Sequence, residues 1–505
     1  MAFLVGAGTV KTAANWLFME LLLRSPVFLA ALHATIVAVV GVRVVMRRSA
    51  RGIALSWLLL VAALPYVGAF AYLLIGERRI GRRRSRGIGE LRTDFSEIAR
   101  ATIPEDFTAV DWPALPAAAQ AMDRLGRTLV RGATVRGNRF ELFSDTQQIL
   151  AAFVRDIDAA RSSVLMEFYI WNEGGAADDV LEAVIRAARR GVRCLTLIDA
   201  LGARPWWKSH QPQRLRDAGV ALRAALPVGL LRTLVGRTDL RLHRKIVVID
   251  GAAAWTGSMN LVDPRYFKQD SAVGEWIDAM VRVEGPAVNA LAATLIGDWS
   301  LETGEPIEKL IASASLGGAQ PVGTSNIQVV PSGPGETGDG LLQMILALLN
   351  AAQRELVLTT PYLVPDDSMI LALRGAAARG VQVTLIVPGK VDSLLTRYAS
   401  RSYYDDLLDA GVAIQLYRGG LLHTKSISVD RTMSMFGTVN LDMRSLWLNY
   451  EVALFVYQPE FADALHALQQ TYIDQSTRLD PADWEARPFR ERLLENTLRL
   501  FSPLL

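Results

Sequence analysis

The feature that most constrains the fold is an internal duplication within the 505-residue chain. Similar segments recur in the same order in residues 163–220 and 356–412. In both, short runs rich in β-branched residues alternate with Ala/Leu/Arg-rich stretches of helical character, which is the pattern of βαβ units around a buried sheet. We therefore expect two α/β halves with a pseudo-twofold relation.

Domain boundaries follow from this repeat. We expect residues 136–312 to form the first half and residues 326–505 to form the second. A segment rich in Gly, Ala, Ser and Pro, residues 313–325, is expected to link the halves. Residues 87–135 are expected to form a further linker, preceded by a membrane anchor with a basic juxtamembrane patch in residues 1–86.

Each half ends in the same polar motif, His-x-Lys-x4-Asp followed by Gly-(Ser/Thr)-x-Asn, with identical spacing in the two copies. Residues two apart on a strand share a face, so the histidine and lysine of a motif are expected to project together, as are its hydroxyl and amide side chains. The residues concerned are His243, Lys245, Asp250, Ser258 and Asn260 in the first half and His423, Lys425, Asp430, Thr438 and Asn440 in the second.

These residue types suit phosphoryl transfer without a metal ion or another cofactor. A neutral imidazole can attack phosphorus, a lysine can neutralise the nonbridging oxygens, and hydroxyl and amide donors can bind the developing charge. A second, protonated histidine can give its proton to the leaving alkoxide and later take one from the incoming alcohol. We therefore expect the two motifs to meet in one active site.

Two carboxylates further along are candidates for orienting the histidines. Asp278 and Glu451 each lead into an apolar strand, and each is expected to accept the far ring N–H of the histidine in its own half. The spacing is not symmetric, because Asp278 lies 35 residues after His243 whereas Glu451 lies 28 residues after His423. The alternative for either carboxylate is a solvated strand end.

The N-terminal region is strongly apolar. Residues 26–46 and 53–75 are expected to form two transmembrane helices, since crossing a bilayer needs ~20 apolar residues, and Pro65 is expected to kink the second helix. Six arginines in residues 78–86 favour a cytoplasmic position for the catalytic part, although the arginines in residues 47–51, between the spans, weaken this inference. The arginine cluster could hold anionic lipid headgroups or act only as a topology signal.

Charge and cysteine content narrow the choice of partners. The 54 basic and 51 acidic residues leave a net charge of only +3, so no global field favours nucleic acid as a partner. The one cysteine, Cys194, excludes an intramolecular disulfide and is compatible with a reducing compartment.

Two segments are expected to contact lipid. Residues 226–237 mix apolar residues with arginines just before the first motif, and residues 487–505 have a one-sided apolar pattern with four arginines. For both, packing against the protein itself is the alternative. Aromatic and basic residues in loops after the predicted strands are expected to line the substrate channel, namely Trp206, Trp207, Tyr362, Arg397, Arg401 and Tyr404.

The two motifs closely resemble the signature motifs of the phospholipase D superfamily. Within that superfamily, the chain is similar to bacterial cardiolipin synthases of the membrane-anchored A type. The resemblance covers nearly the whole chain, and its most specific parts are residues 64–68, 256–270, 420–425, 437–449 and 501–505.

This resemblance implies that one phosphatidylglycerol donates its phosphatidyl group to a histidine and releases glycerol, after which a second phosphatidylglycerol accepts the group to give cardiolipin. The usual order in the superfamily implies His243 as the nucleophile and His423 as the acid and base. A multi-pass protein of the bacterial inner membrane, with its catalytic part on the cytoplasmic side of the bilayer, is implied as well. A hydrolase, or a transphosphatidylase with another acceptor, would share the same motifs, and the possibility of a homo-oligomer stays open.

Overall fold

The computed structural model of the chain describes residues 25–46, 51–64, 66–72, 76, 104–227, 239–313, 319–335 and 338–500. The described residues divide into two compact units, a smaller one within residues 25–76 and a larger one within residues 104–500. The larger unit contains both repeats and all of the motif residues. The arginine cluster at 78–86, residues 228–237 of the predicted lipid-contacting loop and the last five residues, 501–505, lie outside the described residues.

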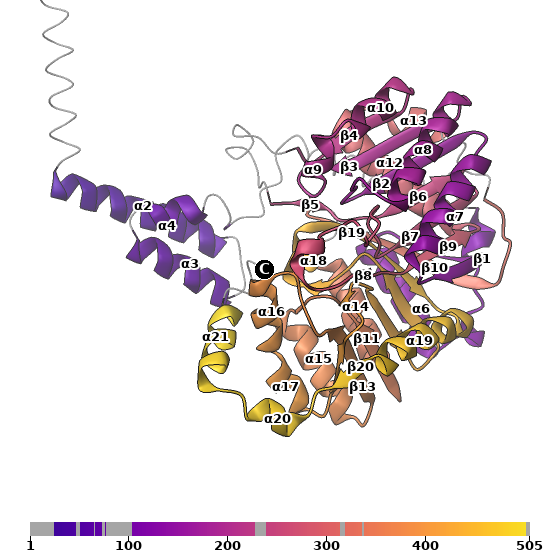
Figure 1. Cartoon of the computed structure of the whole chain (residues 1–505). Coiled ribbons are helices and arrows are strands. Elements are labelled where there is room, and N and C mark those ends of the chain that lie inside the picture. The colour runs from indigo at the N-terminus through magenta and orange to yellow at the C-terminus, as the bar shows by residue number, and fades with distance from the viewer. Residues whose placement is uncertain are drawn as a thin grey trace, which may run out of the picture. The chain divides into compact units, whose positions relative to one another are not determined.

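The two repeats share one 16-stranded mixed sheet (Figure 1). The strands of the first half lie in the spatial order β4 (Ala221–Ala225), β3 (Arg193–Asp199), β2 (Ser163–Phe168), β6 (Ile246–Ile249), β7 (Ala253–Gly257), β9 (Met280–Glu284) and β1 (Thr134–Phe143). The second half repeats this order as β14 (Ala413–Tyr417), β13 (Gln382–Pro388), β11 (Glu355–Thr359), β16 (Ser426–Val429), β17 (Met433–Gly437), β19 (Asn449–Val456) and β10 (Ser325–Ser332). The predicted pair of related α/β halves is therefore confirmed.

The halves are joined at the centre of the sheet, where β1 and β10 pair antiparallel. Within each half, three strands are parallel (β2, β3 and β4, or β11, β13 and β14), and the others pair antiparallel. The crossovers between parallel strands are made by helices, including α8 (Ala176–Arg189) and α15 (Asp367–Ala378). β2 and β19 are buried along their whole length, because helices cover the sheet on both faces.

The hydrophobic core runs through both halves. Helix α12 (Ala287–Thr303) of the first half and helix α19 (Pro459–Asp474) of the second half contribute to a single cluster of buried side chains. In this cluster Leu291 and Leu165 from the first half lie with Leu454 from the second half. The halves consequently fold as one compact unit and place their motifs in a common framework.

Part of the segment expected to be a linker belongs to this core. Residues 87–135 include helix α6 (Ala117–Leu129), whose buried Ala119 and Met122 pack in the same cluster as Leu348 of the second half. The strong one-sided apolar pattern of α6 explains this packing, since a helix with one apolar face is stable when that face is buried. The first half begins slightly earlier than expected, with β1 at Thr134.

In the smaller unit, the described residues form α2 (Pro26–Met46), α3 (Arg51–Ala63) and α4 (Val67–Ala71). Of these residues, only α2, with 21 residues and a mean hydropathy of 2.1, is long and apolar enough to cross a membrane. The expected continuous second helix over 53–75 is not formed, because α3 ends at Ala63, just before Pro65. Its 13 residues span about 20 Å, which is less than the ~30 Å of a bilayer core.

Helix α4 packs back against α3. A Cβ atom on Gly68 would lie 2.5 Å from the Leu60 carbonyl oxygen, so this close approach requires glycine. Val40 and Val44 of α2 are buried in one cluster with Val61 of α3. The described part of the anchor is thus a packed group of helices, and a second membrane crossing stays a prediction.

Candidate active site

A short parallel strand pair docks the first motif on the second half. Strand β5 (Arg241–Leu242) lies directly before His243 and pairs with the start of β19, with Leu242 opposite Tyr450. The His243 backbone N–H continues this ladder by donating to the Tyr450 carbonyl at 2.9 Å. The next residue on β19 is Glu451, which therefore lies beside His243.

The second motif docks on the first half in the same way. Strand β15 (Leu421–Leu422) pairs in parallel with β8 (Trp276–Ile277). The His423 backbone N–H donates to the Ile277 carbonyl at 2.8 Å. Asp278 follows Ile277 and therefore lies beside His423.

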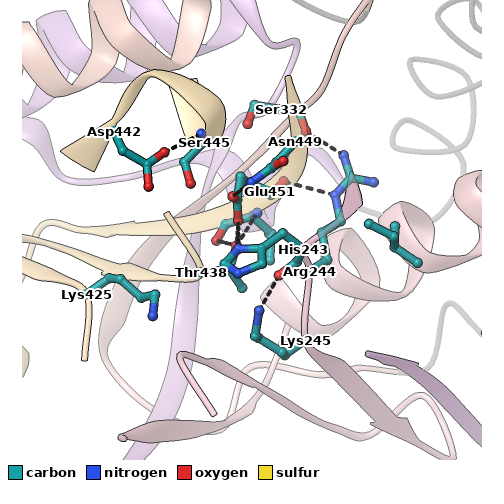
Figure 2. Close-up of polar contacts among 12 residues, drawn as sticks. His243, Arg244, Lys245, Ser332, Lys425, Thr438, Asp442, Ser445, Asn449 and Glu451 are labelled. Atoms are coloured by element: carbon teal, nitrogen blue, oxygen red, sulfur yellow. Dashed lines mark hydrogen bonds and ion pairs between the residues drawn. The ribbon is translucent and has the colours of Figure 1, made fainter. Parts of the chain in front are cut away.

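Each histidine is consequently oriented by a carboxylate from the other half. His243 Nδ1 lies 2.9 Å from Glu451 Oε2, and His423 Nδ1 lies 2.7 Å from Asp278 Oδ1 (Figure 2 shows the first pair). The expectation that each carboxylate serves the histidine of its own half is therefore wrong. Because an ionised carboxylate only accepts hydrogen bonds, each Nδ1 is assigned the proton, and each Nε2 carries a lone pair.

The motif hydroxyls hold these carboxylates in place. Thr438 Oγ1 donates to Glu451 Oε2 at 2.6 Å, and Ser258 Oγ donates to Asp278 Oδ1 at 2.6 Å. The expected role of the hydroxyls as direct donors to a phosphate is wrong, since their protons are used by the carboxylates. The exchange of serine for threonine between the two copies keeps this hydrogen bond.

The two motif lysines are fully buried and are anchored by backbone carbonyls. Lys245 Nζ donates to the His243 carbonyl at 2.6 Å, and Lys425 Nζ donates to the His423 carbonyl at 2.5 Å (Figure 2 shows the Lys245 contact). Each hydrogen bond uses one of the three N–H groups of a protonated lysine. The positive charges of the two lysines, close to the two histidines in sequence and structure, favour an anionic phosphate at this site.

Both histidines line one cavity of about 800 Å³, within the usual size range of ligand pockets. Asn260 and Asn440 also line it, as expected for amide donors near the substrate. Aromatic rings contact the imidazoles, with Tyr169 5.1 Å from His243 and Trp276 4.4 Å from His423 between ring centroids. Residues from both halves thus enclose a single site.

Of the residues expected to line the channel, only Tyr362 borders this cavity. Trp206 is buried in the core and stacks on Trp171 with centroids 4.8 Å apart. Arg397, Arg401 and Tyr404 border a separate, small cavity of about 40 Å³. Loop position after a strand was too weak a criterion to separate cavity-lining residues from packed ones.

The motif aspartates lie outside the cavity. Four strand residues separate Lys245 from Asp250, so at ~3.3 Å per residue the carboxylate is about 16 Å further along the strand. Asp250 and Asp430, both with φ 52°, accept backbone N–H groups at the start of the neighbouring strand. The donors, at 2.7–2.9 Å, are Arg161, Ser162 and Ser163 for Asp250 and Gln353, Arg354 and Glu355 for Asp430. Their predicted catalytic role is therefore corrected to a structural one.

Comparison with known proteins agrees with this geometry. A family model described as "Cardiolipin synthase, PLD-like domain" matches residues 153–288 and 345–471, and one described as "Phospholipase_D-nuclease N-terminal" matches residues 34–77. Cardiolipin synthase A of Edwardsiella ictaluri is 43% identical over 481 residues, which cover 93% of this chain and 96% of that protein. The corresponding protein of Erwinia tasmaniensis is 42% identical with the same coverage. This chain belongs to the cardiolipin synthase A family.

The fold of this family member is also found in a solved structure. Phosphatidylserine synthase of Haemophilus influenzae matches with a TM-score of 0.59 at 16% sequence identity, over 76% of this chain and 100% of that one. This likeness shows a common fold over the matched residues.

Burial controls the ionisation of the site in this family member. Desolvation lowers the pKa of His243 and of His423, although the adjacent carboxylates act in the opposite direction. It also lowers the pKa of Lys245 to about 8 and that of Lys425 to about 7. Despite burial, the interaction with His423, the charge of Lys425 and the hydrogen bond from Ser258 lower the pKa of Asp278 to about 2. The negative charges of two carboxylates therefore balance the positive charges of two ammonium groups, and the two imidazoles between them are neutral.

Several polar residues of the site were missed from sequence. Arg244, inside the first motif, is buried and donates to the Glu451 carbonyl at 2.9 Å, and it also pairs with Asp298 (Figure 2 shows the Glu451 contact). At the cavity wall, Lys268 of the first half pairs with Asp392 of the second half at 3.0 Å. The position of Arg244 between His243 and Lys245 was a sequence signal that could have marked it as part of the site. The pairing of Lys268 with Asp392 leaves no local signal in the sequence.

Proposed function

We propose that this protein transfers a phosphatidyl group from one phosphatidylglycerol to another, giving cardiolipin and glycerol through a phosphohistidine intermediate. The observation that carries this proposal is the presence of two carboxylate-bound imidazoles on one cavity, one from each half. Two buried lysines supply the positive charge that a phosphodiester needs. Relatives that match nearly the whole chain are named cardiolipin synthases.

In the first step, His243 Nε2 attacks the phosphorus of the donor lipid, and the bond from phosphorus to the glycerol oxygen breaks. His423, protonated at Nε2, gives that proton to the departing oxygen, so that neutral glycerol leaves. Glu451 accepts the Nδ1–H of His243 and stabilises the positive charge that this ring acquires. Lys245 and Lys425 neutralise the charge on the nonbridging oxygens.

In the second step, His423 acts as a base instead of an acid, and His243 becomes the leaving group. Neutral His423 takes the proton of a hydroxyl on the second phosphatidylglycerol, and the resulting oxygen attacks the phosphohistidine. The bond between phosphorus and His243 Nε2 breaks, which releases cardiolipin and restores the neutral imidazole. Each proton that His423 takes up in one turnover is returned in the next.

Substrate binding can favour the protonated form of His423, with the proton taken up from solvent. Within the protein, the negative charges of Asp278 and Glu451 balance the positive charges of the two lysines. A bound phosphodiester adds one negative charge, which favours protonation of one imidazole and raises its pKa. Asp278, which accepts the Nδ1–H of His423, supports the protonated form of this ring.

The place of the reaction is proposed to be the bacterial inner membrane, with the catalytic part on its cytoplasmic side. Helix α2 is apolar and long enough to act as an anchor. The apolar composition of residues 53–75 and the arginine cluster at 78–86 are the sequence features that support a multi-pass arrangement of this orientation.

The test uses the purified full-length chain in vesicles of phosphatidylglycerol, with products identified by mass spectrometry. Cardiolipin and glycerol are expected in equal amounts. Phosphatidic acid without cardiolipin would refute lipid transfer and support a hydrolase. His243→Ala and His423→Ala should each remove nearly all turnover, and substantial turnover by either variant would contradict a shared site.

A further inference from the structure

The rim of the cavity includes the beginning of helix α16 (Leu394–Arg401). Ser393 caps this helix, since its side chain accepts the Thr396 backbone N–H at 3.3 Å. Ser393 and Thr396 both line the active-site cavity. Leu394 and Leu395, which lie between them in sequence, are exposed instead. Two large apolar side chains therefore project outward at the edge of the site.

Helix α21 (Phe489–Arg499) packs against α16 through an ion-pair network. Arg401 Nε lies 2.5 Å from Glu495 Oε1, and a second nitrogen of Arg401 lies 3.1 Å from Glu491. Glu495 is buried in this contact, and Arg487 lies 3.2 Å from its other oxygen. The contact holds α21 in a defined orientation next to the cavity rim.

The opposite side of α21 is apolar and exposed. At about 100° per residue, Phe489, Leu493 and Leu500 lie within about 40° of one another around the helix axis, on the side away from Glu491 and Glu495. Together with Leu394 and Leu395, these side chains are between 52% and 77% exposed. The five residues Leu394, Leu395, Phe489, Leu493 and Leu500 are called the apolar rim below.

The charge and the position of the apolar rim indicate that it contacts a lipid surface rather than another protein. Exposed Arg490 and Arg492 flank the apolar stripe of α21 on its two sides, as in helices that lie in the headgroup region of anionic bilayers. The proposed reaction also takes two phospholipids, whose acyl chains have to remain in an apolar environment while the headgroups enter the cavity. A membrane in contact with the rim would meet this requirement.

We propose that the apolar rim inserts into the surface of an anionic phospholipid bilayer, so that donor and acceptor lipids enter the cavity past the start of α16 without leaving the membrane. This inference rests on the proposed function in taking phospholipids as both substrates. It assigns to the catalytic unit a membrane contact of its own, in addition to the anchor helix α2.

The decisive experiment is site-directed labelling of the full-length chain. Cys194 is buried, so Leu394→Cys and Leu493→Cys each offer one accessible thiol for an environment-sensitive fluorophore. In vesicles of phosphatidylglycerol and phosphatidylethanolamine, both labels are expected to shift to shorter emission wavelength and to be quenched by spin-labelled acyl chains. Val322→Cys is the matched control, because Val322 is also an exposed apolar residue and precedes β10 at the end remote from Glu451.

Equal quenching of the Leu394 and Val322 labels would overturn the proposal. A shift to shorter wavelength without quenching by lipid would overturn it too, and would indicate that helices α2–α4 or a second copy of the chain cover the rim. Quenching requires no catalysis, so it can be observed even if the protein hydrolyses phosphatidylglycerol. Cardiolipin formation without quenching would reject the membrane contact and leave the proposed function intact.

A kinetic measurement gives an independent readout. Phe489→Glu combined with Leu493→Glu is expected to raise the KM for phosphatidylglycerol in vesicles roughly tenfold, since it places charge where apolar side chains enter the bilayer. Turnover of a short-chain, water-soluble phosphatidylglycerol should be unchanged. Val322→Glu should change neither value, and an equal loss on both substrates would contradict a role in membrane contact.

Discussion

The crossed pairing of histidines and carboxylates has a kinetic consequence that can be measured. Glu451→Gln removes the negative charge beside His243, and Asp278→Asn removes it beside His423, with little change of volume in either case. A hydrogen bond to a charged buried group is worth about 1.5–3 kcal/mol. Loss of this amount from the transition state corresponds to a decrease of about 10- to 150-fold in rate.

The two histidines can be separated by the choice of leaving group. A phosphodiester that releases p-nitrophenolate needs no proton from His423 in the first step, so the burst of phenolate reports attack by His243. Glu451→Gln should slow this burst by about 10- to 150-fold. Asp278→Asn should leave the burst near the wild-type rate but slow cardiolipin formation from phosphatidylglycerol by a similar factor, because that reaction uses His423 as acid and base.

The exposed ion pair of Glu182 with Arg214 supplies a matched control, and Glu182→Gln should change neither rate. Mass spectrometry of the trapped intermediate identifies the phosphorylated ring. Phosphate on His243 together with a burst slowed only by Asp278→Asn would refute the crossed pairing. If phosphate is found on His423 and only Asp278→Asn slows the burst, the crossed pairing is correct and His423, not His243, is the nucleophile.

Three further predictions concern other charged residues. Because burial lowers the pKa of Lys425 to about 7, its positive charge is lost as the pH rises through that value, so kcat/KM should fall above about pH 7. In a pH profile, Lys425→Arg should move the start of this decrease to about pH 8, where Lys245 loses its charge. Asp250→Asn should lower the free energy of unfolding by about 1–3 kcal/mol in a denaturant titration, because Asp250 accepts hydrogen bonds from three backbone N–H groups. The kcat of the folded protein should be unchanged, since these contacts lie outside the cavity. Lys268→Gln should raise the KM for phosphatidylglycerol about 3- to 10-fold at low salt, and less at high salt, since it removes a cation from the cavity wall.

Much of the catalytic chemistry was predictable from local sequence. The matched spacing of His243 with Lys245 and of His423 with Lys425 requires only that residues two apart on a strand share a face. Repetition of this spacing also implied two related halves, and the sheet order confirms them. Hydropathy alone located helix α2, since an unbroken apolar run of this length has few other stable environments.

Other expectations failed because they depended on hydrogen-bond partners that local spacing does not specify. The aspartates of the two motifs recur as regularly as the histidines, yet Asp250 and Asp430 bind backbone at the remote end of their strands. Ser258 and Thr438 were expected to contact phosphate and instead hold carboxylates. Regular recurrence in sequence therefore did not distinguish a catalytic role from a structural one.

The sequence by itself determined the chemical groups of the site and the strand faces that carry them, because these depend on composition and on the two-residue period of a strand. Only the tertiary structure decided which carboxylate meets which imidazole. His243 and Glu451 are 208 residues apart, and His423 and Asp278 are 145 apart. Their contacts arise from the parallel pairing of β5 with β19 and of β15 with β8, and such pairing between distant segments is set by the packing of the two halves around a common core.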